Sequence, residues 1–129
     1  MAGKVVLADT SVLIDYFRKT DKSKTQLIAL LDADYTFCIS VITEYEIYSG
    51  ASPEQTIYWQ NFLKKVIVLS LDQEAIKTAV TINSKLKIIS KQIDKADLFI
   101  AAIALSNNLP LATLNKKHFN RIDELVLID

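Results

Sequence analysis

Three acidic residues lie where a folded α/β chain could bring carboxylates together. Asp9 ends an apolar run, Glu44 lies in the first turns of a predicted helix, and Asp97 opens a second helical pattern. Two carboxylates about 4 Å apart repel by roughly 4 kcal/mol at an effective dielectric near 20, so such a cluster must raise a pKa or bind a cation. Oxygen ligands favour a hard ion, Mg²⁺ or Mn²⁺. Such an ion polarises a phosphate and activates water, which predicts hydrolysis of a nucleic-acid backbone.

Asp9 stands at the predicted carboxyl end of a strand. Residues 5–8 read VVLA, a continuous apolar run that is typical of a strand buried on both faces of a parallel sheet. In open α/β sheets, ligands bind beyond the carboxyl ends of the strands. The alternative is that Asp9, Thr10 or Ser11 only caps the next helix, because these residue types are common N-caps.

Glu44 and Glu46 share one predicted helix, which Ser40 is expected to cap. Helical spacing puts Glu44 on the same face as Val41 and Ile47, whereas the neighbours of Glu46 are mostly polar or small. We therefore expect Glu44 to point inward, where a carboxylate is costly unless it is paired or bound to a metal. The alternative is a surface glutamate at the edge of the apolar stripe.

The segment 94–108, DKADLFIAAIALSNN, has the pattern of a helix packed closely on a sheet. Asp97 falls in its first turn, on the face that also carries Ile100 and Ala101, so its side chain is predicted to face the core. Asp94 lies three residues earlier. The alternative for both acids is that they only complement the positive end of the helix dipole.

Strand-like and helix-like segments alternate along the whole chain, which predicts a parallel α/β sheet with helices on both faces. The predicted strands lie at 5–8, 36–39, 66–69, 109–113 and 125–128. Helices are expected after Asp9, from Asp21 or Ser23, after Ser40, after Ser52 with Pro53 in the first turn, and after Ser70 or Asp72.

Length and composition predict one cytoplasmic domain, residues 1–129. With 129 residues, half of them hydrophobic, the chain can bury a core without disulfides, and Cys38 is expected to be a small buried hydrophobe. No signal peptide or membrane span is recognisable. The 15 basic and 15 acidic residues cancel, so nucleic acid would have to be held by local patches. A net charge of zero also favours self-association or a covering partner.

Lysines gather in the segment 85–93, which is only partly periodic and is predicted to be a loop or frayed turn. Lys85, Lys87, Lys91 and nearby Lys95 are the residues expected to touch a phosphate backbone. The alternative is an ordinary solvated face.

Aromatic residues are concentrated on two predicted helices. Tyr45 and Tyr48 lie on one, and Tyr58, Trp59 and Phe62 on the next. This cluster is large for a small core, so part of it is interpreted as an interface, although core filling is the default for any single ring.

These motifs together resemble the PIN-domain ribonucleases, and within them the VapC-type toxins of toxin-antitoxin pairs. The resemblance spans essentially the whole chain and rests on the order and spacing of DTSVLID at 9–15, ITEYEI at 42–47, DLFIAAIA at 97–104 and ATLNKKHF at 112–119.

The resemblance implies a three-layer α/β/α sandwich, Mg²⁺-dependent endoribonuclease activity with Mn²⁺ as a possible substitute, a homodimer, and inhibition by an antitoxin that covers the active-site groove. By position, Asp9, Glu44 and Asp97 match the three catalytic and metal-binding acids of the family. Ser11 matches a hydroxyl that often lines the site.

The fourth position departs from the family pattern. Two residues after Thr113 the chain has Asn115, which can orient water without supplying charge, and His118 stands where an aspartate is common. Imidazole is a poor Mg²⁺ ligand but an acceptable Mn²⁺ ligand, and it could also act as an acid or contact a phosphate. The alternative is a structural histidine, and Asp94 could supply the missing charge.

Other functions fit the residues less well. A haloacid-dehalogenase-like phosphatase needs a second acid where Ser11 stands, and a receiver domain needs paired acids after its first strand. The remaining alternative is a catalytically weakened PIN domain that binds RNA or a partner protein.

Overall fold

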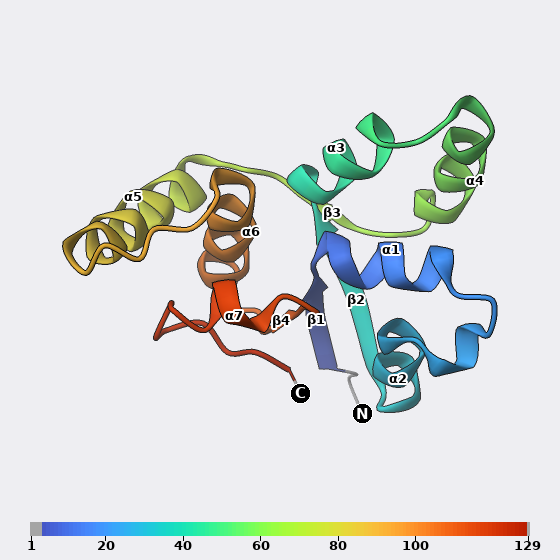
Figure 1. The fold of residues 1–129 in the computed structure, drawn as a ribbon, viewed down its shortest axis with the longest axis horizontal. Helices are drawn as coiled ribbons and strands as arrows, with labels where there is room; N and C mark the ends of the chain where they lie inside the picture. Colours follow the sequence, from blue (N-terminus) through green and yellow to red (C-terminus); the bar gives the residue numbers. More distant parts are fainter. Residues whose placement is uncertain (1–3, 129) are drawn as a thin grey trace.

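The computed structural model describes residues 4–128 and forms a four-stranded sheet with helices on both faces (Figure 1). The strand order is β3-β2-β1-β4, and every pairing is parallel. The strands are β1 (Lys4–Ala8), β2 (Tyr35–Ser40), β3 (Val68–Leu69) and β4 (Leu111–Ala112). The helices are α1 (Thr10–Arg18), the 3₁₀ turn η1 (Lys22–Lys24), α2 (Gln26–Asp32), α3 (Val41–Ser49), α4 (Pro53–Leu63), α5 (Gln73–Ile88), α6 (Lys95–Ser106) and α7 (Lys116–Phe119). Residues 1–3 and 129 of the predicted domain lie outside the described residues.

Alternate residues of the central strands enter two separate hydrophobic cores, because successive side chains of a strand point to opposite faces. Leu7 and Cys38 pack in the core that includes α5 and α6. Val6 and Ile39 pack in the core formed with α1 to α4. Figure 1 shows the two groups of helices on opposite sides of β1 and β2. The three-layer α/β/α sandwich is therefore confirmed.

Local capping fixes where several helices begin. The side chains of Ser40 and Asp72 accept hydrogen bonds from the backbone N–H groups of Thr43 and Ala75. Ser52 forms a capping box with Gln55, and Pro53 occupies the first turn of α4. These caps match the predicted helix starts, and each satisfies backbone donors that a helix leaves unpaired.

Several predicted boundaries are wrong. The strands predicted at 66–69 and 109–113 are shorter, Val68–Leu69 and Leu111–Ala112. The helix α5 continues to Ile88, so residues 85–88 are helical rather than a loop. The helix expected from Asp21 or Ser23 is divided into η1 and α2, and the side chain of Thr25 caps α2. The last predicted strand is reduced to one isolated bridge between Leu111 and Leu127. Hydrophobic periodicity locates helices and strands better than it locates their ends.

The aromatic cluster is buried only in part. Trp59 is 2% exposed, and its ring packs 5.2 Å from Phe17 and 5.5 Å from Phe62, measured between centroids. Tyr45, in contrast, is 70% exposed. Trp59 is therefore a core residue, and the interpretation of the cluster as an interface can apply only to its exposed members.

Two further predictions concern composition. Cys38 is a free, buried cysteine, as expected, and burial raises the pKa of its thiol. Within residues 4–128, no helix combines the length and the hydrophobicity that crossing a membrane requires.

Candidate active site

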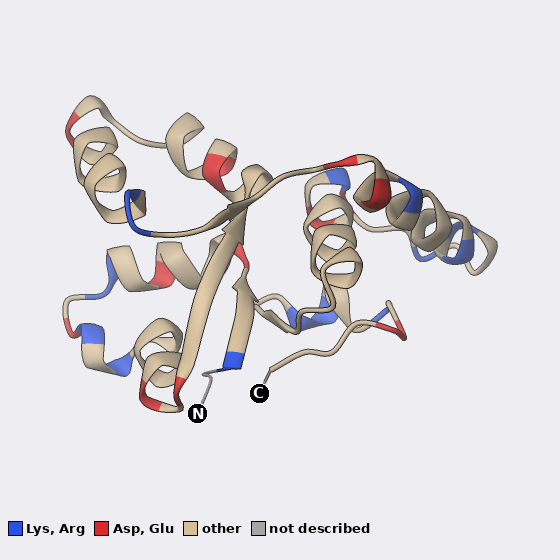
Figure 2. Ribbon diagram, turned by 180° about the vertical axis from the view of Figure 1, so that it is seen from behind, with Lys and Arg blue, Asp and Glu red and all other residues tan. Residues whose placement is uncertain are grey.

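The carboxyl ends of β1, β2 and β4 meet at one edge of the sheet. Ala8 is paired with Ala112, so the next residues, Asp9 and Thr113, leave neighbouring strands side by side. Ser40 ends β2 at the same edge and starts α3. In Figure 2, acidic positions (red) lie on α3, at the junction of β1 with α1, and near the start of α6, around this end of the strands.

Asp9 is buried, with 2% of its surface exposed, and its carboxylate is held by hydroxyl groups. Ser11 Oγ donates to Asp9 Oδ2 over 2.9 Å, and Thr113 Oγ1 donates to the same oxygen over 2.8 Å. Asp9 occupies the N-cap position of α1, yet its side chain makes no capping hydrogen bond. The capping alternative therefore does not describe what the Asp9 carboxylate does.

One oxygen of Asp9 remains available to a ligand. Among residues 4–128, no protein group donates to Oδ1, and no side-chain oxygen that is sealed from solvent lacks a hydrogen-bond partner. Oδ1 must therefore reach solvent. The two hydroxyl donors fix the orientation of the carboxylate while leaving this oxygen free.

The same two hydroxyls shape the loop that follows β4. Ser11 Oγ accepts from the backbone N–H of Leu114 over 3.0 Å, and Thr113 Oγ1 accepts from the N–H of Asn115 over 2.9 Å. Each hydroxyl thus links Asp9 on one side to a loop amide on the other. Ser11 and Thr113 are positioned to hold both the acid and the loop, and Asn115, at the end of that loop, is the N-cap residue of α7.

Asp97 lies in the first turn of α6 and contacts His118 of α7. His118 Nδ1 is 3.2 Å from Asp97 Oδ2, and the two side chains are 51% and 18% exposed. Burial raises the pKa of Asp97, the nearby charge of Asp9 raises it further, and the contact with His118 opposes these effects. Asp94, which is exposed and makes no capping hydrogen bond, adds a smaller increase to the pKa of Asp97.

The effect of the Asp9 charge on Asp97 is the feature that fits a cation. The charge of Asp9 is one of the causes that raise the pKa of Asp97, and the positive charge of a bound divalent ion would oppose this effect. Within the described residues, no group of three or more His, Cys, Asp or Glu side chains is arranged to hold a metal. Mg²⁺ commonly binds through one or two carboxylates and keeps several waters, so the pair of Asp9 and Asp97 fits such an ion.

Glu44 and Glu46 differ less in burial than the helical pattern predicts. Both side chains are half-buried. Glu44 lies in the first turn of α3, beside the carboxyl end of β2. Glu46 accepts a hydrogen bond from Thr10 Oγ1 over 2.6 Å, and Thr10 Oγ1 is also 2.9 Å from Thr43 Oγ1. This link was not predicted from the sequence. The available signal was that Thr43 and Glu46 are three residues apart and share a helix face that could meet α1.

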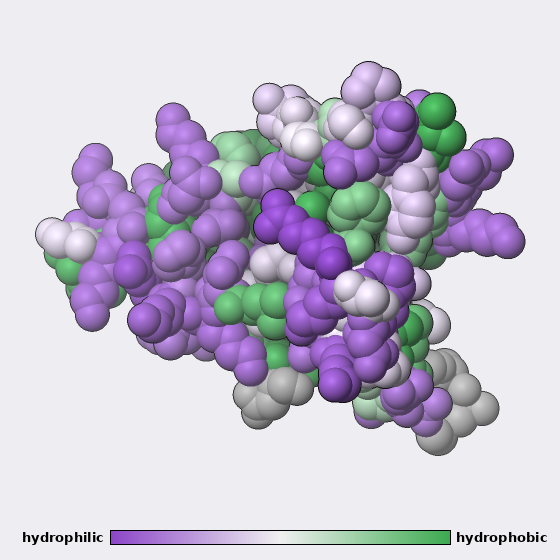
Figure 3. Space-filling view, turned by 45° about the vertical axis from the view of Figure 1, so that its right-hand side comes forward, coloured by the Kyte–Doolittle hydropathy of each residue, from purple (hydrophilic) through white to green (hydrophobic). Residues whose placement is uncertain are grey.

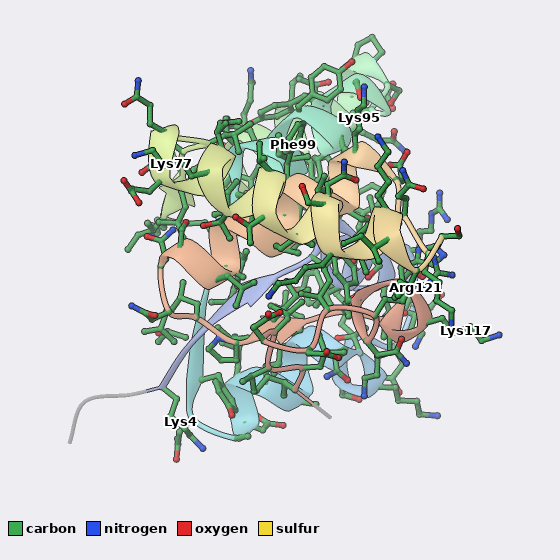
Figure 4. The ribbon with its side chains drawn as sticks, turned by 90° about the vertical axis from the view of Figure 1, so that its left-hand side faces the viewer. Lys4, Lys77, Lys95, Phe99, Lys117 and Arg121 are labelled. Carbon is green, nitrogen blue, oxygen red and sulfur yellow. The ribbon has the colours of Figure 1, made fainter. Side chains whose placement is uncertain are left out.

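Of the four lysines expected to touch a phosphate backbone, Lys85 and Lys87 lie on α5, Lys91 lies in the loop that follows α5, and Lys95 is the first residue of α6. Lys85 forms an ion pair with Glu124 in which both side chains are exposed. Figure 4 shows Lys95, Lys117 and Arg121 along one side of the molecule, whereas Lys77 lies on the opposite side of the view. The Arg121 guanidinium donates to the backbone carbonyls of Lys91 and Gln92, which attaches the loop before α6 to the segment after α7.

Comparison with known proteins agrees with this arrangement. The model of the PIN domain matches residues 6–125. The chain belongs to the PIN-domain family. The family resemblance inferred from the motifs is thereby confirmed.

Relatives of this PIN domain are VapC proteins. Ribonuclease VapC1 of Methanocaldococcus jannaschii is 38% identical over 123 residues, which are 95% of this chain and 84% of the relative. VapBC-1 from nontypeable Haemophilus influenzae contains a chain that superposes with a TM-score of 0.80 at 27% identity, covering 97% of both chains. A chain of VapBC2 from Rickettsia felis, bound to a DNA fragment from their promoter, has a TM-score of 0.84 at 23% identity over 96% of this chain and 97% of that chain, a likeness of fold.

Proposed function

We propose that this PIN domain is a metal-dependent endoribonuclease and the toxin of a VapBC-type toxin-antitoxin pair. The observation that carries the proposal is the position of Asp9 and Asp97 at the carboxyl edge of the sheet, where the charge of Asp9 contributes to raising the pKa of Asp97. Membership of the PIN-domain family and the similarity to a VapC ribonuclease support the substrate class, RNA.

The proposed catalytic residues are Asp9, Glu44, Asp97 and Asn115. Asp9 and Asp97 would hold Mg²⁺, or Mn²⁺, and Glu44 is the third proposed acid on account of its place in the first turn of α3. When bound, the ion would supply positive charge at the phosphate and make a water molecule more acidic.

The surrounding residues are proposed to orient these groups. Ser11 and Thr113 fix Asp9 through their hydroxyls, and Asn115 lies on the same loop, where its carboxamide can orient water. His118 holds Asp97 in place. The exposed ring of His118 can also approach a phosphate of the RNA and exchange a proton with that phosphate. Asp94 is the accessory acid that adds negative charge near Asp97.

The proposed partners follow from the relatives. Solved neighbours are toxin-antitoxin complexes, which supports a cognate antitoxin and, with RNA as substrate, a cytoplasmic site of action. We also propose a homodimer, for which the exposed apolar residues Tyr45 and Ile57 offer a surface.

A non-catalytic RNA-binding or partner-binding module is the second candidate. The observation that favours it is that the described residues hold no three-ligand metal group, together with Asn115 and His118 at positions where acids are common in the family.

The test is cleavage of total cellular RNA by the purified protein with Mg²⁺, with Mn²⁺ and with chelator, beside Asp9→Asn. Metal-dependent fragments that disappear in the variant are the expected result. Calorimetric titration of the metal into both proteins gives a separate readout, because the nuclease should bind the ion through Asp9. Equal cleavage by Asp9→Asn, or folded protein that neither cleaves nor binds metal, would overturn the proposal in favour of the binding module.

A further inference from the structure

A pocket of about 370 Å³ lies beside Asp9 and Asp97, and neither of these residues lines it. It is lined by Gln26, Thr113, Leu114, Asn115, Lys116, Lys117 and His118. Its volume falls near the lower end of the roughly 300–1,000 Å³ range of small-molecule pockets, which suits one nucleotide rather than a larger ligand.

Two of the lining residues join the pocket directly to the proposed active site. Thr113 Oγ1 donates to Asp9 Oδ2 over 2.8 Å, and His118 Nδ1 lies 3.2 Å from Asp97 Oδ2. The pocket therefore begins one side chain away from each acid. An RNA strand whose phosphate is cleaved at Asp9 and Asp97 would bring a neighbouring nucleotide to this opening.

The chemistry of the lining is that of a base-binding site. Leu114 is an apolar side chain that is 50% exposed, although it is surrounded by polar neighbours. Such a surface can pack against the face of a heterocycle. Gln26 and Asn115 carry carboxamides, which can donate and accept hydrogen bonds at the edge of a base, and Lys117 can contact the backbone phosphates.

The side chain of Gln26 lines the pocket and can bind a ligand there. It is half-buried at the first position of α2, where its backbone N–H lies 3.4 Å from Asp15 Oδ2. In the part of the chain that the structure describes, no hydrogen bond to its carboxamide is present. Its donor and acceptor are therefore available to a ligand that enters the pocket.

The loop that forms the floor is fixed before any ligand arrives. The N–H groups of Leu114 and Asn115 donate to Ser11 Oγ and Thr113 Oγ1, and both hydroxyls in turn donate to Asp9 Oδ2. A preformed floor lowers the entropic cost of ordering the site on binding. It also fixes the distance between the pocket and the catalytic carboxylate.

We propose that this pocket binds an unpaired base of the RNA next to the cleaved phosphate, and that Gln26 reads the edge of that base. The inference rests on the proposed nuclease function and adds a determinant of sequence preference to it. Sequence-specific recognition of RNA usually targets unpaired bases that are turned out and packed against side chains, which is the arrangement that Leu114 and Gln26 offer.

The first test measures nucleotide binding by NMR of ¹⁵N-labelled protein. Chelator is present so that no cleavage occurs. Adenosine, guanosine, cytidine and uridine 5′-monophosphates are titrated separately, and inorganic phosphate serves as the control ligand. We expect the carboxamide signal of Gln26 and the amide signals of Leu114 and Asn115 to shift, most strongly with one of the four nucleotides. Absence of these shifts, or identical shifts with phosphate alone, would overturn the inference.

The second test maps cleavage sites in an RNA pool for the wild type, Gln26→Ala and the matched control Gln73→Ala. Gln73 occupies the first position of α5, as Gln26 does in α2, but lies outside the pocket. We expect Gln26→Ala to weaken the base preference at one position beside the cut by roughly 5- to 100-fold, the effect of losing a two-point contact to a base. Gln73→Ala should keep the wild-type preference.

The two tests separate this inference from the proposed function. Unchanged preference in Gln26→Ala, with active enzyme, would remove the pocket's role and leave the nuclease intact. If the wild type cleaves no RNA, the proposed function fails, and the nucleotide titration still decides whether the pocket binds a base.

Discussion

Thr113 Oγ1 donates a hydrogen bond of 2.8 Å to Oδ2 of Asp9, across two neighbouring strands and 104 residues of sequence. Both residues are almost fully buried, with 1% and 2% of their surfaces exposed. Because the same hydroxyl accepts from the backbone of Asn115, Thr113 connects the acid at the end of β1 to the loop that carries Asn115 and His118. The orientation of Asp9 and the shape of that loop are therefore coupled.

Replacing this hydroxyl should damage activity more than folding. Thr113→Val keeps the shape of the side chain and removes one donor from Asp9, so we expect a loss of roughly 1.5–3 kcal/mol of unfolding free energy, the range for a hydrogen bond to a charged group. Cleavage should fall more than tenfold, because Asp9 and the loop lose their common anchor. Denaturant unfolding and initial cleavage rates measure the two effects.

The control for this variant is Thr81→Val. Thr81 is an exposed threonine of α5 whose hydroxyl donates to a backbone carbonyl four residues earlier. Thr81→Val should change neither the free energy of unfolding nor the cleavage rate appreciably. If Thr113→Val cleaves RNA as fast as this control, the hydroxyl has no role in orienting Asp9.

The charged carboxylate of Asp97 should lower the free energy of unfolding at neutral pH. Burial and the charge of Asp9 raise its pKa above the ordinary value of 3.8, so the folded state pays for the charged form. A raised carboxyl pKa means that the folded state binds more protons between the two pKa values, and stability falls as the pH rises through that interval. Asp97→Asn removes the charge, and we therefore expect its Tm to exceed the wild-type Tm by a few degrees at about pH 7.

The advantage of Asp97→Asn should shrink as the pH approaches the ordinary value of 3.8, where the wild-type carboxyl is itself protonated. Scanning calorimetry of both proteins between about pH 4 and pH 7 measures this dependence. Asp32→Asn, a change at an exposed acid of α2, is the control and should not show it. An Asp97→Asn variant that is less stable than the wild type at neutral pH would contradict the raised pKa.

Local patterns predicted the parts of the site that depend on neighbouring residues. The apolar run at 5–8 placed Asp9 at a strand end, and the caps at Ser40, Ser52 and Asp72 follow from residue type and position. These features are fixed within a few residues of sequence, where helix capping and strand burial act.

Contacts between distant segments could not be predicted in the same way. The hydrogen bond from Thr10 to Glu46 spans 36 residues, and the contact between Asp97 and His118 depends on how α7 packs against α6. The burial of Trp59 likewise depends on rings contributed by α1 and α4 together. Helical periodicity indicates which face is apolar but not which element covers that face.

The two glutamates of α3 provide a direct test of the proposed third acid. We expect Glu44→Gln to lower the cleavage rate at least tenfold with little change in stability, because the proposal gives its charge a part in catalysis. Glu46→Gln should mainly weaken the link between α1 and α3, since the neutral carboxamide still accepts from Thr10 but without a full charge. Cleavage rates and thermal unfolding are measured for both variants, with Glu54→Gln on α4 as the control. These measurements show which glutamate is the third acid. A loss of activity confined to Glu46→Gln would transfer the role to Glu46.

The proposed homodimer can be tested on the exposed apolar residues that the core does not explain. Over the face that carries α1 to α4, hydrophobic surface (green) is interrupted by hydrophilic side chains (purple) in Figure 3. Ile57 of α4 and Val80 of α5 are 62% and 61% exposed, so lysine at either position should leave the fold intact. If the dimer uses the surface of α3 and α4, light scattering at micromolar concentration should give twice the chain mass of 14.5 kDa for the wild type and for Val80→Lys, and a monomer for Ile57→Lys. Dissociation by Val80→Lys instead would place the interface on α5, and a monomeric wild type would exclude the dimer.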